Sequence, residues 1–387
     1  MDVAGKRCFV RVDFNVPMDE FQKITDDVRI RAALPTINDL VDRKARIILA
    51  SHLGRPEGER NMKYSLGHVR QRLSRLLDRE VFFAEDCVGP EAEKAVAALK
   101  DGDVLLLENL RFHKEEEEND PEFSKKLARL ADLYVNDAFG TAHRAHASTE
   151  GITKFVKPAG CGYLMKKEIE YFNRSVANPI RPVVAIVGGA KASTKIKIFM
   201  NLIDKVDKII VGGGLAFTFY KALGYGVGKN RYEENMLDAV AEIRKKAREK
   251  GVNFYLPVDF VVADRLDPRA TTKVVPGKEI PDGWVAPDIG PASVTLFTEV
   301  LNDAKTIIWN GPMGVFEMDQ FSRGTMAMVR AVANAYALTI AGGGDTDVAI
   351  HRAGESDKFS FISTGGGAFL ELLEGKDLPA IAALTDA

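Results

Sequence analysis

The stretch VVAIVGGAK (183–191) joins an unbroken apolar run to a glycine turn that ends in a lysine. An apolar run without polar alternation is typical of a strand buried on both faces, as in a parallel sheet covered by helices. Similar runs recur along the chain, and amphipathic helical patterns lie between them. This alternation predicts an α/β protein with right-handed crossovers.

The expected strands fall into two groups along the chain. In the first half they are CFVRV (8–12), RIILA (46–50), VFFA (81–84), DVLLLE (103–108) and LYVND (133–137). In the second half they are VVAIVG (183–188), KIIVGGG (208–214), NFYLP (253–257), TIIWNG (306–311), LTIAGGG (338–344) and FSFIST (359–364). Each group has enough strands for a sheet of its own.

Two helical patterns between the strands carry clear start signals. The pattern SLGHVRQRLSRLLD (65–78) has Ser65 placed as its cap. In DPEFSKKLARLAD (120–132), Asp120 is placed as the cap and Pro121 takes the first helical position, where its missing N–H costs nothing.

The length of the chain predicts two domains. At 387 residues it exceeds the ~250–300 residues at which a single hydrophobic core stops growing. The helical pattern KKEIEYFNRSVANPIRP (166–182) ends at two prolines, and the strand pattern restarts at Val183. We interpret residues 166–182 as the helix that connects the domains.

Composition narrows the class of function. The net charge of −2 gives no broad basic field, so neither nucleic acid nor a membrane surface is expected as a partner. Cys8, Cys87 and Cys161 form no CxxC pair, which predicts buried thiols in a reducing compartment. No signal-like segment and no apolar run of ~18 residues occurs, so we expect a cytoplasmic protein. The run EEEEN (115–119) is expected to be a solvated loop or helix edge.

The residues that follow the first-half strands are basic. Since the carboxyl ends of parallel strands meet at one edge of a sheet, the loops after them share one rim. The rim would contain His52, Arg55, Arg111, His143, Arg144 and His146. Guanidinium groups suit phosphate and carboxylate oxygens. A basic rim in a slightly acidic chain predicts a small, highly charged anionic ligand.

The residues that follow the second-half strands are glycines. The turns are VGGAK (187–191), VGGGLAF (211–217), WNGP (309–312), AGGGDT (341–346) and STGGGAF (363–369). Glycine lets backbone N–H groups approach a ligand closely, and a helix N-terminus favours negative charge. These turns predict a nucleotide site. Asp345 is placed either to hold Mg²⁺ or to cap the following helix. Lys191 and Lys195, four apart at a helix start, would put two ammonium groups on one face over the phosphates.

Three other classes of protein are alternatives to one that binds a nucleotide and a small anion. The chain has no GxxxxGK[ST] and no GxGxxG after a strand, which argues against a P-loop enzyme and an NAD-dependent two-domain dehydrogenase. A non-catalytic binding or scaffold protein on the same fold is the other alternative, because fold alone does not give function.

The motifs closely resemble the phosphoglycerate kinase family. They match its signature segments in order and spacing over nearly the whole chain: RVDFNVP (11–17), SHLGRP (51–56), LLLENLRFH (105–113), NDAFGTAHRAH (136–146), GGAK (188–191), WNGP (309–312), GGGDT (342–346) and STGGGAFLELLEGK (363–376). The family transfers a phosphoryl group from 1,3-bisphosphoglycerate to ADP, giving 3-phosphoglycerate and ATP. Phe369 departs from the family, which commonly has a small residue there.

The resemblance implies an α/β fold of two Rossmann-like doubly wound parallel-sheet domains, joined by a hinge helix and separated by a deep cleft. Residues 1–167 would bind phosphoglycerate and residues 168–375 the nucleotide. Residues 376–387 would return to the N-terminal domain. The family also implies domains that close around ATP or ADP and Mg²⁺, and we expect a hinge near 166–182 that helps exclude water. Because two complete domains are expected in one chain, a monomer is the simplest expectation.

The resemblance also implies the site residues. The phosphoglycerate site would be Asp13, Phe14, Asn15, Arg29, His52, Leu53, Gly54, Arg55, Arg111 and Arg144. The nucleotide site would be Lys191, Lys195, Glu317, Gly343, Gly344, Asp345 and Thr346, with Asp345 as the metal contact. Arg29, Lys191 and Lys195 would be catalytic, since positioning and charge stabilisation dominate phosphoryl transfer and no strong general base is needed.

Plainer roles remain open for several of these residues. Arg29 would otherwise form a surface ion pair with Asp26 or Asp27, worth only ~0–1 kcal/mol. The other arginines of the rim would be helix caps or interdomain ion pairs. Glu317 would be an exposed loop residue, and Trp309 is expected in the core.

Overall fold

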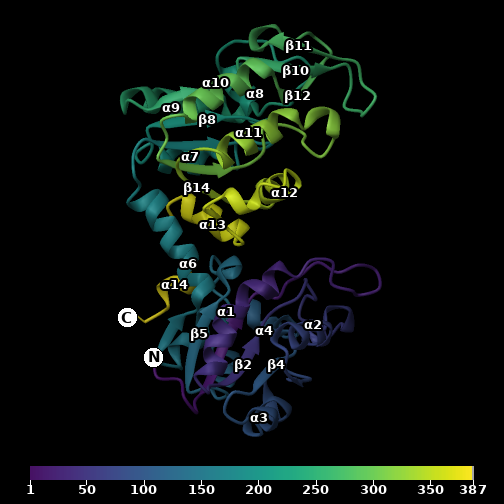
Figure 1. Cartoon of the computed structure of the whole chain (residues 1–387), viewed down its shortest axis with the longest axis vertical. Coiled ribbons are helices and arrows are strands. Elements are labelled where there is room, and N and C mark those ends of the chain that lie inside the picture. Colours follow the sequence, from purple (N-terminus) through teal and green to yellow (C-terminus); the bar gives the residue numbers. More distant parts are fainter. Residues whose placement is uncertain (386–387) are drawn as a thin grey trace. The chain divides into compact units, whose positions relative to one another are not determined.

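The computed structural model describes residues 1–385, which divide into two units. The N-terminal unit contains Met1–Ile169 and the segment that begins at Asp377, and the C-terminal unit contains Glu170–Lys376 (Figure 1). Each unit holds a six-stranded sheet in which all neighbouring strands are parallel. The predicted α/β class is confirmed.

The N-terminal sheet has the strand order β3-β4-β2-β1-β5-β6. Its strands are β1 (Arg7–Val12), β2 (Arg46–Ala50), β3 (Val81–Ala84), β4 (Val104–Leu107), β5 (Leu133–Asp137) and β6 (Ala159–Cys161). The helices of this unit are α1 (Val28–Asp42), α2 (Gly67–Leu77), α3 (Gly89–Ala97), α4 (Lys114–Glu117), α5 (Pro121–Ala128) and α14 (Pro379–Ala382).

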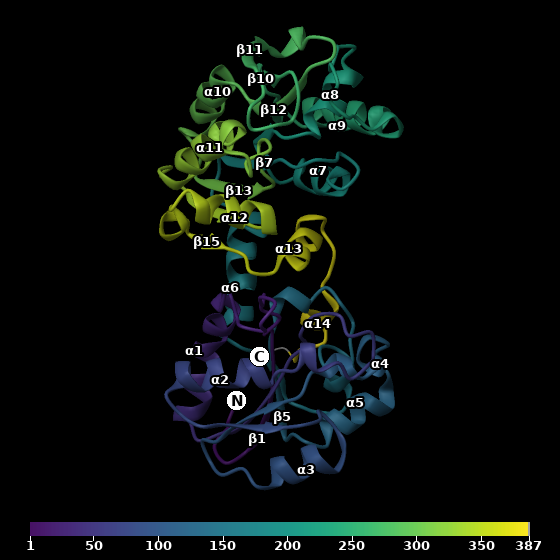
Figure 2. The ribbon, with the colours of Figure 1, turned by 90° about the vertical axis from the view of Figure 1, so that its right-hand side faces the viewer.

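The side chains of β1 explain why helices cover both faces of this sheet. Cys8 and Val10 join a core with α1 and α2, while Phe9 joins a second core with α3 and α5. Successive strand residues point to opposite faces, so a strand of continuous apolar residues serves both cores. Figure 2 shows α1 and α2 apart from α3 and α5 across the sheet. The C-terminal segment also belongs here, since Ala380 N donates to Ala142 O at 3.1 Å.

The C-terminal sheet has the order β15-β14-β13-β7-β8-β9. Its strands are β7 (Val183–Val187), β8 (Lys208–Val211), β9 (Asn253–Tyr255), β13 (Thr306–Asn310), β14 (Leu338–Ala341) and β15 (Phe361–Ile362). In chain order this is the doubly wound dinucleotide-binding arrangement, whose strand order reverses beside the first strand. The N-terminal order differs from it, because β4 lies between β2 and β3.

Helices cover both faces of the C-terminal sheet as well. They are α7 (Ile196–Leu202), α8 (Ala216–Ala222), α9 (Leu237–Glu249), α10 (Pro291–Leu301), α11 (Arg323–Ala333), α12 (Gly344–Arg352) and α13 (Gly366–Leu373). Residues of α10, α11 and α12 share one core with β7 and β13, and α7, α8 and α9 pack together, on the other side of the sheet in Figure 2. Trp309 of β13 is fully buried in that first core, as expected.

The helix α6 (Tyr163–Phe172) contains the division between the units. A π-helical turn continues it to Ala177, so the expected connecting helix is present but begins and ends earlier than residues 166–182. Ring stacking holds its second half within the C-terminal unit, where the rings of Tyr171 and Phe361 lie 4.6 Å apart.

The sequence patterns missed one small sheet. Strands β10 (Asp259–Ala263), β11 (Thr272–Pro276) and β12 (Val285–Ile289) form an antiparallel three-stranded sheet. The two outer strands lack the apolar run of the buried strands, because β11 is mostly exposed and β12 contains Pro287. The apolar run of β10, FVVA (260–263), was not recognised as a strand. Edge strands tolerate both features.

Two local expectations are wrong, and two expected caps are confirmed. Ser65 has an extended backbone before α2, and its Oγ accepts a hydrogen bond from Gly67 N at 3.1 Å while its hydroxyl donates to Glu108 at 2.7 Å. Cys161 is exposed rather than buried. The acidic run at 115–119 is not wholly solvated, since Glu116 is fully buried on α4. Asp120 does cap α5, accepting a hydrogen bond from Phe123 N at 2.7 Å.

Candidate active site

The predicted phosphoglycerate residues come from the carboxyl ends of β1, β2 and β4, from the loop that follows β5, and from the start of α1. Three hydrogen bonds from backbone N–H groups to side chains connect these loops. They are Phe14 N to Ser51 Oγ at 2.8 Å, Gly54 N to Asn15 Oδ1 at 2.9 Å, and Leu53 N to Asn109 Oδ1 at 3.2 Å. Ligands of open α/β sheets bind beyond this edge.

Arg29 lies in the first turn of α1 and reaches the end of β1. Its Nη1 donates to Asp13 Oδ2 at 2.9 Å. Asp27 instead pairs with Arg31 at 2.9 Å, and Asp26 Oδ1 accepts from the backbone at the start of α1. The alternative that Arg29 pairs with Asp26 or Asp27 is therefore wrong. A half-buried guanidinium is held at the ligand edge of the sheet.

His52 lies beside the same carboxylate. Its Nδ1 is 4.0 Å from Asp13 Oδ1. Burial, together with the positive charges of Arg11, Arg111 and Arg29, lowers the pKa of His52 well below its ordinary value. The ring is thus neutral at physiological pH and serves as a hydrogen-bonding group, not a cation.

Arg111 is buried on the short 3₁₀ turn Leu110–Phe112 after β4. Its Nη1 donates to Gly54 O at 3.0 Å, and its Nε is 3.2 Å from Glu117 Oε1. Burial lowers the pKa of Arg111, and the nearby charges of Arg11 and Arg144 act in the same direction. Guanidinium groups this close repel one another, so an anionic ligand beside them is stabilised.

Arg144 and Arg55 complete the predicted basic group. Arg144 Nε donates to His143 Nε2 at 3.3 Å, so the neighbouring histidine orients this arginine. Arg55 follows Gly54 in the chain and has an exposed side chain.

The predicted nucleotide residues line two adjoining cavities of the C-terminal unit. A cavity of about 270 Å³ is lined by Lys191, Lys195, Gly343, Gly344, Asp345 and Thr346, among others. A second cavity of about 510 Å³ is lined by Glu317, Phe217, Phe260, Val285 and Met313, among others. Gly189, Ala190, Pro312 and Asp345 line both. One cavity is therefore lined by glycines and lysines, and the other is largely apolar.

The smaller cavity lies where the strand order reverses, between β7 and β13. Gly343 precedes α12 with φ +104°, and a Cβ there would lie 2.6 Å from Asn310 Nδ2, so only glycine fits. Thr346 Oγ1 accepts from Gly311 N at 2.8 Å. Asp345 lies inside the first turn of α12, whose N-cap is Gly343 without a side-chain cap. The alternative that Asp345 caps this helix is wrong.

The two lysines do not share a helix face as expected. The helix α7 begins at Ile196, with Lys195 as its N-cap, and Lys191 lies in the preceding turn. Both still line the smaller cavity. Lys195 Nζ donates to Asn310 Oδ1, and burial lowers its pKa while the charges of Asp345 and Glu374 oppose that shift.

Packing accommodates the unusual Phe369. Its ring is 2% exposed, and a Cβ built on Gly342 would lie 2.1 Å from its Cδ1. The ring thus fills space that the absent side chain of Gly342 leaves.

Sequence reasoning missed two residues that hold the site. Asn310, at the end of β13, accepts from Lys195 and donates to Gly342 O at 2.5 Å. Arg11 is buried beside His52, with its Nη2 3.3 Å from His52 Nδ1. Both are polar residues at the ligand end of an apolar strand, which is the signal that could have found them.

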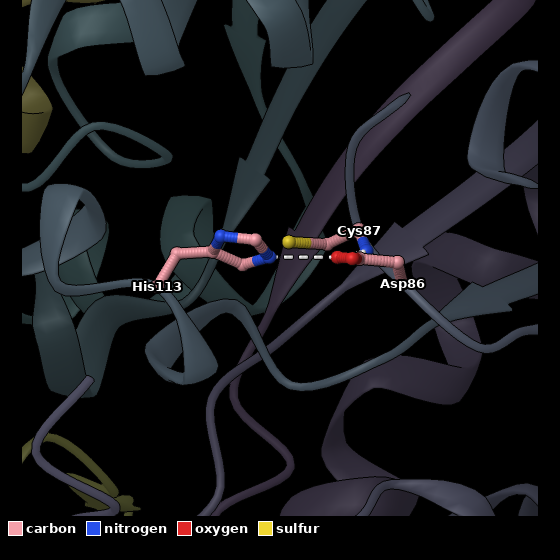
Figure 3. Close-up of side chains that lie close together, drawn as sticks. All are labelled: Asp86, Cys87 and His113. Atoms are coloured by element: carbon pink, nitrogen blue, oxygen red, sulfur yellow. Dashed lines mark hydrogen bonds and ion pairs between the residues drawn. The ribbon is translucent and has the colours of Figure 1, made fainter. Parts of the chain in front are cut away.

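Asp86, Cys87 and His113 form a separate cluster whose possible ligand atoms lie within 4.8 Å of one another (Figure 3). His113 Nε2 is 2.7 Å from Asp86 Oδ1. Burial raises the pKa of the Cys87 thiol well above its ordinary value, so the sulfur is protonated. The His113 nitrogen that faces this cluster is already hydrogen-bonded to Asp86, and we interpret the cluster as structural.

Comparison with known proteins gives one consistent answer. The family model described as phosphoglycerate kinase matches residues 1–376. A phosphoglycerate kinase of Geotalea uraniireducens is 63% identical over 100% of this chain and 96% of its own length. A cytosolic phosphoglycerate kinase of Triticum aestivum is 57% identical, with coverage of 100% and 97%. The solved phosphoglycerate kinase structure from Coxiella burnetii has a TM-score of 0.92 at 45% identity and covers 99% of this chain and 97% of that one.

Proposed function

Because the chain belongs to the phosphoglycerate kinase family, we propose that its two units divide the substrates of that reaction between them. The reaction is the reversible transfer of a phosphoryl group from 1,3-bisphosphoglycerate to ADP, giving 3-phosphoglycerate and ATP. The observation that carries the division is the contrast between the two ligand edges. Charged side chains gather at one, and glycine turns with an apolar cavity lie at the other.

The N-terminal unit binds the phosphoglycerate in this proposal. Arg111 and Arg144 bind the phosphate that is not transferred, together with Arg55, and neutral His52 donates a hydrogen bond to the ligand. Arg29 contacts the phosphoryl group in flight, while its ion pair with Asp13 at 2.9 Å keeps the guanidinium at the sheet edge. A planar, permanently charged donor suits the equatorial oxygens of that group.

The C-terminal unit binds the nucleotide. The apolar cavity of about 510 Å³ suits adenine, and Glu317 at its wall accepts from the ribose hydroxyls. The phosphates occupy the smaller cavity, where backbone N–H groups at the start of α12 and the two lysines face them. The acyl phosphate brings its own leaving group, so the protein supplies position and charge and needs no strong base.

The same cavity fits a magnesium nucleotide. Asp345 contributes an exposed carboxylate to both cavities, and Mg²⁺ prefers one or two carboxylates together with waters and phosphate oxygens. When bound, the ion neutralises phosphate charge. Asp345 would hold it, and Lys191 and Lys195 would hold the remaining phosphate oxygens.

Replacing Asp345 with asparagine should raise the KM for MgATP by about 10–100-fold, the usual effect of losing an acid that supports a metal. The KM for 3-phosphoglycerate should stay close to the wild-type value. Steady-state rates at several Mg²⁺ concentrations measure both constants. Asp347→Asn removes the same charge from the same helix turn, outside the lining of both described cavities. Equal effects of the two variants would reduce the role of Asp345 to helix stabilisation.

Transfer requires the two ligands to meet. Reacting atoms must approach within ~3–3.5 Å, and water must be kept from the acyl phosphate, because hydrolysis would waste it. We therefore propose that the units close on each other about the segment 166–182 when both ligands are bound. The helix α6, which contains the division between the units, is the connection about which they would turn.

Small-angle X-ray scattering tests this closure. The radius of gyration should fall when 3-phosphoglycerate and a non-hydrolysable MgATP analogue are both present. It should fall less, or not at all, with either ligand alone. An unchanged radius with both ligands, at concentrations where calorimetry shows both bound, would contradict closure.

Location and assembly are also part of the proposal. No helix among residues 1–385 is long and apolar enough to cross a membrane, and the relatives from Triticum aestivum and Nicotiana tabacum carry the description cytosolic. We propose a cytoplasmic protein that works as a monomer, because each ligand edge is assembled from one chain. A coupled assay of ATP formation from 1,3-bisphosphoglycerate and ADP, run on fractions of defined molecular mass, tests activity and monomeric state together. Activity confined to a dimer fraction would overturn the monomer.

A further inference from the structure

The N-terminal unit contains a buried chain of polar groups behind the phosphoglycerate residues. Arg11 on β1, Ser148 after β5 and Glu116 on α4 are 1%, 0% and 0% exposed. Arg11 Nε donates to Ser148 Oγ at 2.8 Å, and Ser148 Oγ donates to Glu116 Oε1 at 2.6 Å. Glu116 Oε2 also accepts from Ser148 N at 2.9 Å. Burying a guanidinium and a carboxylate is costly unless both are paired.

Donor and acceptor chemistry gives the directions of the hydrogen bonds in this chain. A guanidinium has five N–H donors and no acceptor, and an ionised carboxylate only accepts. Burial raises the pKa of Glu116, whereas the positive charge of Arg11 and the hydrogen bonds from Ser148 lower it and favour the ionised carboxylate. The single Ser148 proton must therefore point to Glu116, which leaves the oxygen lone pairs for Arg11. Arg11 Nη1 also donates to Val12 O at 2.5 Å. With these contacts the plane of the guanidinium is fixed.

The remaining donor of Arg11 reaches the imidazole of His52. Arg11 Nη2 is 3.3 Å from His52 Nδ1, and since a guanidinium can only donate, Nδ1 must accept. A neutral imidazole has one proton, so that proton is on Nε2. His52 is 4% exposed, and its neutral state follows from burial and from the surrounding positive charges.

We infer that Arg11, held by Ser148 and Glu116, is a positioning residue that fixes His52 in the Nε2–H tautomer. His52 then offers a neutral N–H donor to an oxygen of the phosphorylated acid. This inference rests on the proposed function in one respect, the assignment of His52 to the substrate. The tautomer itself depends only on the contacts of the unliganded chain.

The charges around His52 come from several elements. Those that face it are Arg11 on β1, Asp13 after β1, Arg29 on α1, Arg111 after β4 and His146 after β5. Burial first, and then the arginines, lower the pKa of His146 to about 3. Positive charge thus outweighs negative charge here, which disfavours a second proton on His52 and leaves the choice of tautomer to Arg11.

The tautomer can be read directly by NMR of the full-length protein labelled with ¹⁵N-histidine, with His52→Gln to assign its signals. We expect the two-bond ¹H–¹⁵N correlations of a ring protonated at Nε2 and unprotonated at Nδ1. A proton on Nδ1 would overturn the inference. This measurement requires no substitution in Arg11, Ser148 or Glu116, which we call the relay. Addition of 3-phosphoglycerate should shift the Nε2 signal. If the tautomer is correct but no shift occurs, the proposed substrate role fails and the relay stands.

Two variants test the relay by kinetics. Ser148→Ala removes the bridging hydroxyl, and Glu116→Gln removes the charge with little change of shape. Each should raise the KM for 3-phosphoglycerate about tenfold, as for one misplaced hydrogen bond to a charged ligand. The KM for MgATP should stay unchanged. In both variants His52 should show a mixture of tautomers.

Ser124→Ala is the matched control, because Ser124 is equally buried and its hydroxyl donates to Asp120 O at 2.8 Å. It should keep the wild-type KM for 3-phosphoglycerate. A wild-type KM in Ser148→Ala would overturn the relay. So would equal rises in both KM values, since a merely structural role predicts no selectivity. If Ser148→Ala does not fold, the KM for 3-phosphoglycerate and the KM for MgATP of Glu116→Gln decide between the same outcomes.

Discussion

Replacing Arg29 with alanine is expected to lower turnover by about 10³–10⁵-fold, the range for an arginine that stabilises a transferring phosphoryl group. Stability should change by only ~1 kcal/mol. The lost ion pair with Asp13 involves a side chain that is 38% exposed, and such pairs contribute ~0–1 kcal/mol. Removing a cation from the first turn of α1 offsets part of this loss. Coupled steady-state assays at saturating substrates and urea unfolding measure the two quantities.

Arg31 provides the control for Arg29. It lies two residues further along α1, pairs with Asp27 at 2.9 Å and is 54% exposed. Arg31→Ala should therefore remove a comparable ion pair and leave turnover nearly unchanged. If Arg29→Ala also turns over like the wild type, its side chain does not act on the transferred group.

The second large effect is expected at Lys195. Lys195→Met should lower turnover by about 10²–10³-fold, as when one preorganised donor to a developing charge is removed. Its Nζ is held by Asn310 Oδ1 and lines the smaller cavity. Lys195 is also the N-cap of α7, where a cation is unfavourable by ~0.3–1 kcal/mol. Activity should thus fall while stability stays constant or rises, which thermal unfolding can check.

Lys197→Met is the matched variant. Lys197 is exposed and lies on α7 two residues beyond Lys195. The substitution Lys197→Met therefore removes the same charge and adds the same side chain as Lys195→Met. Turnover close to that of the wild type is expected. If both variants lose turnover equally, the general positive potential of the helix start, rather than contact by Lys195, controls the rate.

Much of the fold could be predicted because the sequence patterns that indicate its strands and turns involve residues close together in the chain. The run RIILA (46–50) matches β2 residue for residue, since an apolar run buried on two faces has little choice of conformation. The glycine turns could also be predicted from the sequence. Gly343 at φ +104° marks a conformation that few other residues adopt.

The parts that could not be predicted depend on contacts between distant residues. No local sequence signal indicates that Arg29 pairs with Asp13 and not with Asp27, which is nearer in the sequence. The pairing depends on how α1 packs beside β1. Burial of Glu116 inside an acidic run is equally non-local, since its partner Ser148 is 32 residues away. A charge run is usually solvated, and only the tertiary structure identifies the exception.

The most direct test of the division of labour between the units is ligand protection in the intact protein, read by hydrogen–deuterium exchange. 3-Phosphoglycerate alone should slow exchange of amides in the loops at 13–15, 51–56 and 109–113. MgADP alone should slow exchange at 187–195, 309–317 and 343–346. Protection of the glycine turns by 3-phosphoglycerate, or of the arginine loops by MgADP, would contradict the assignment of one substrate to each unit.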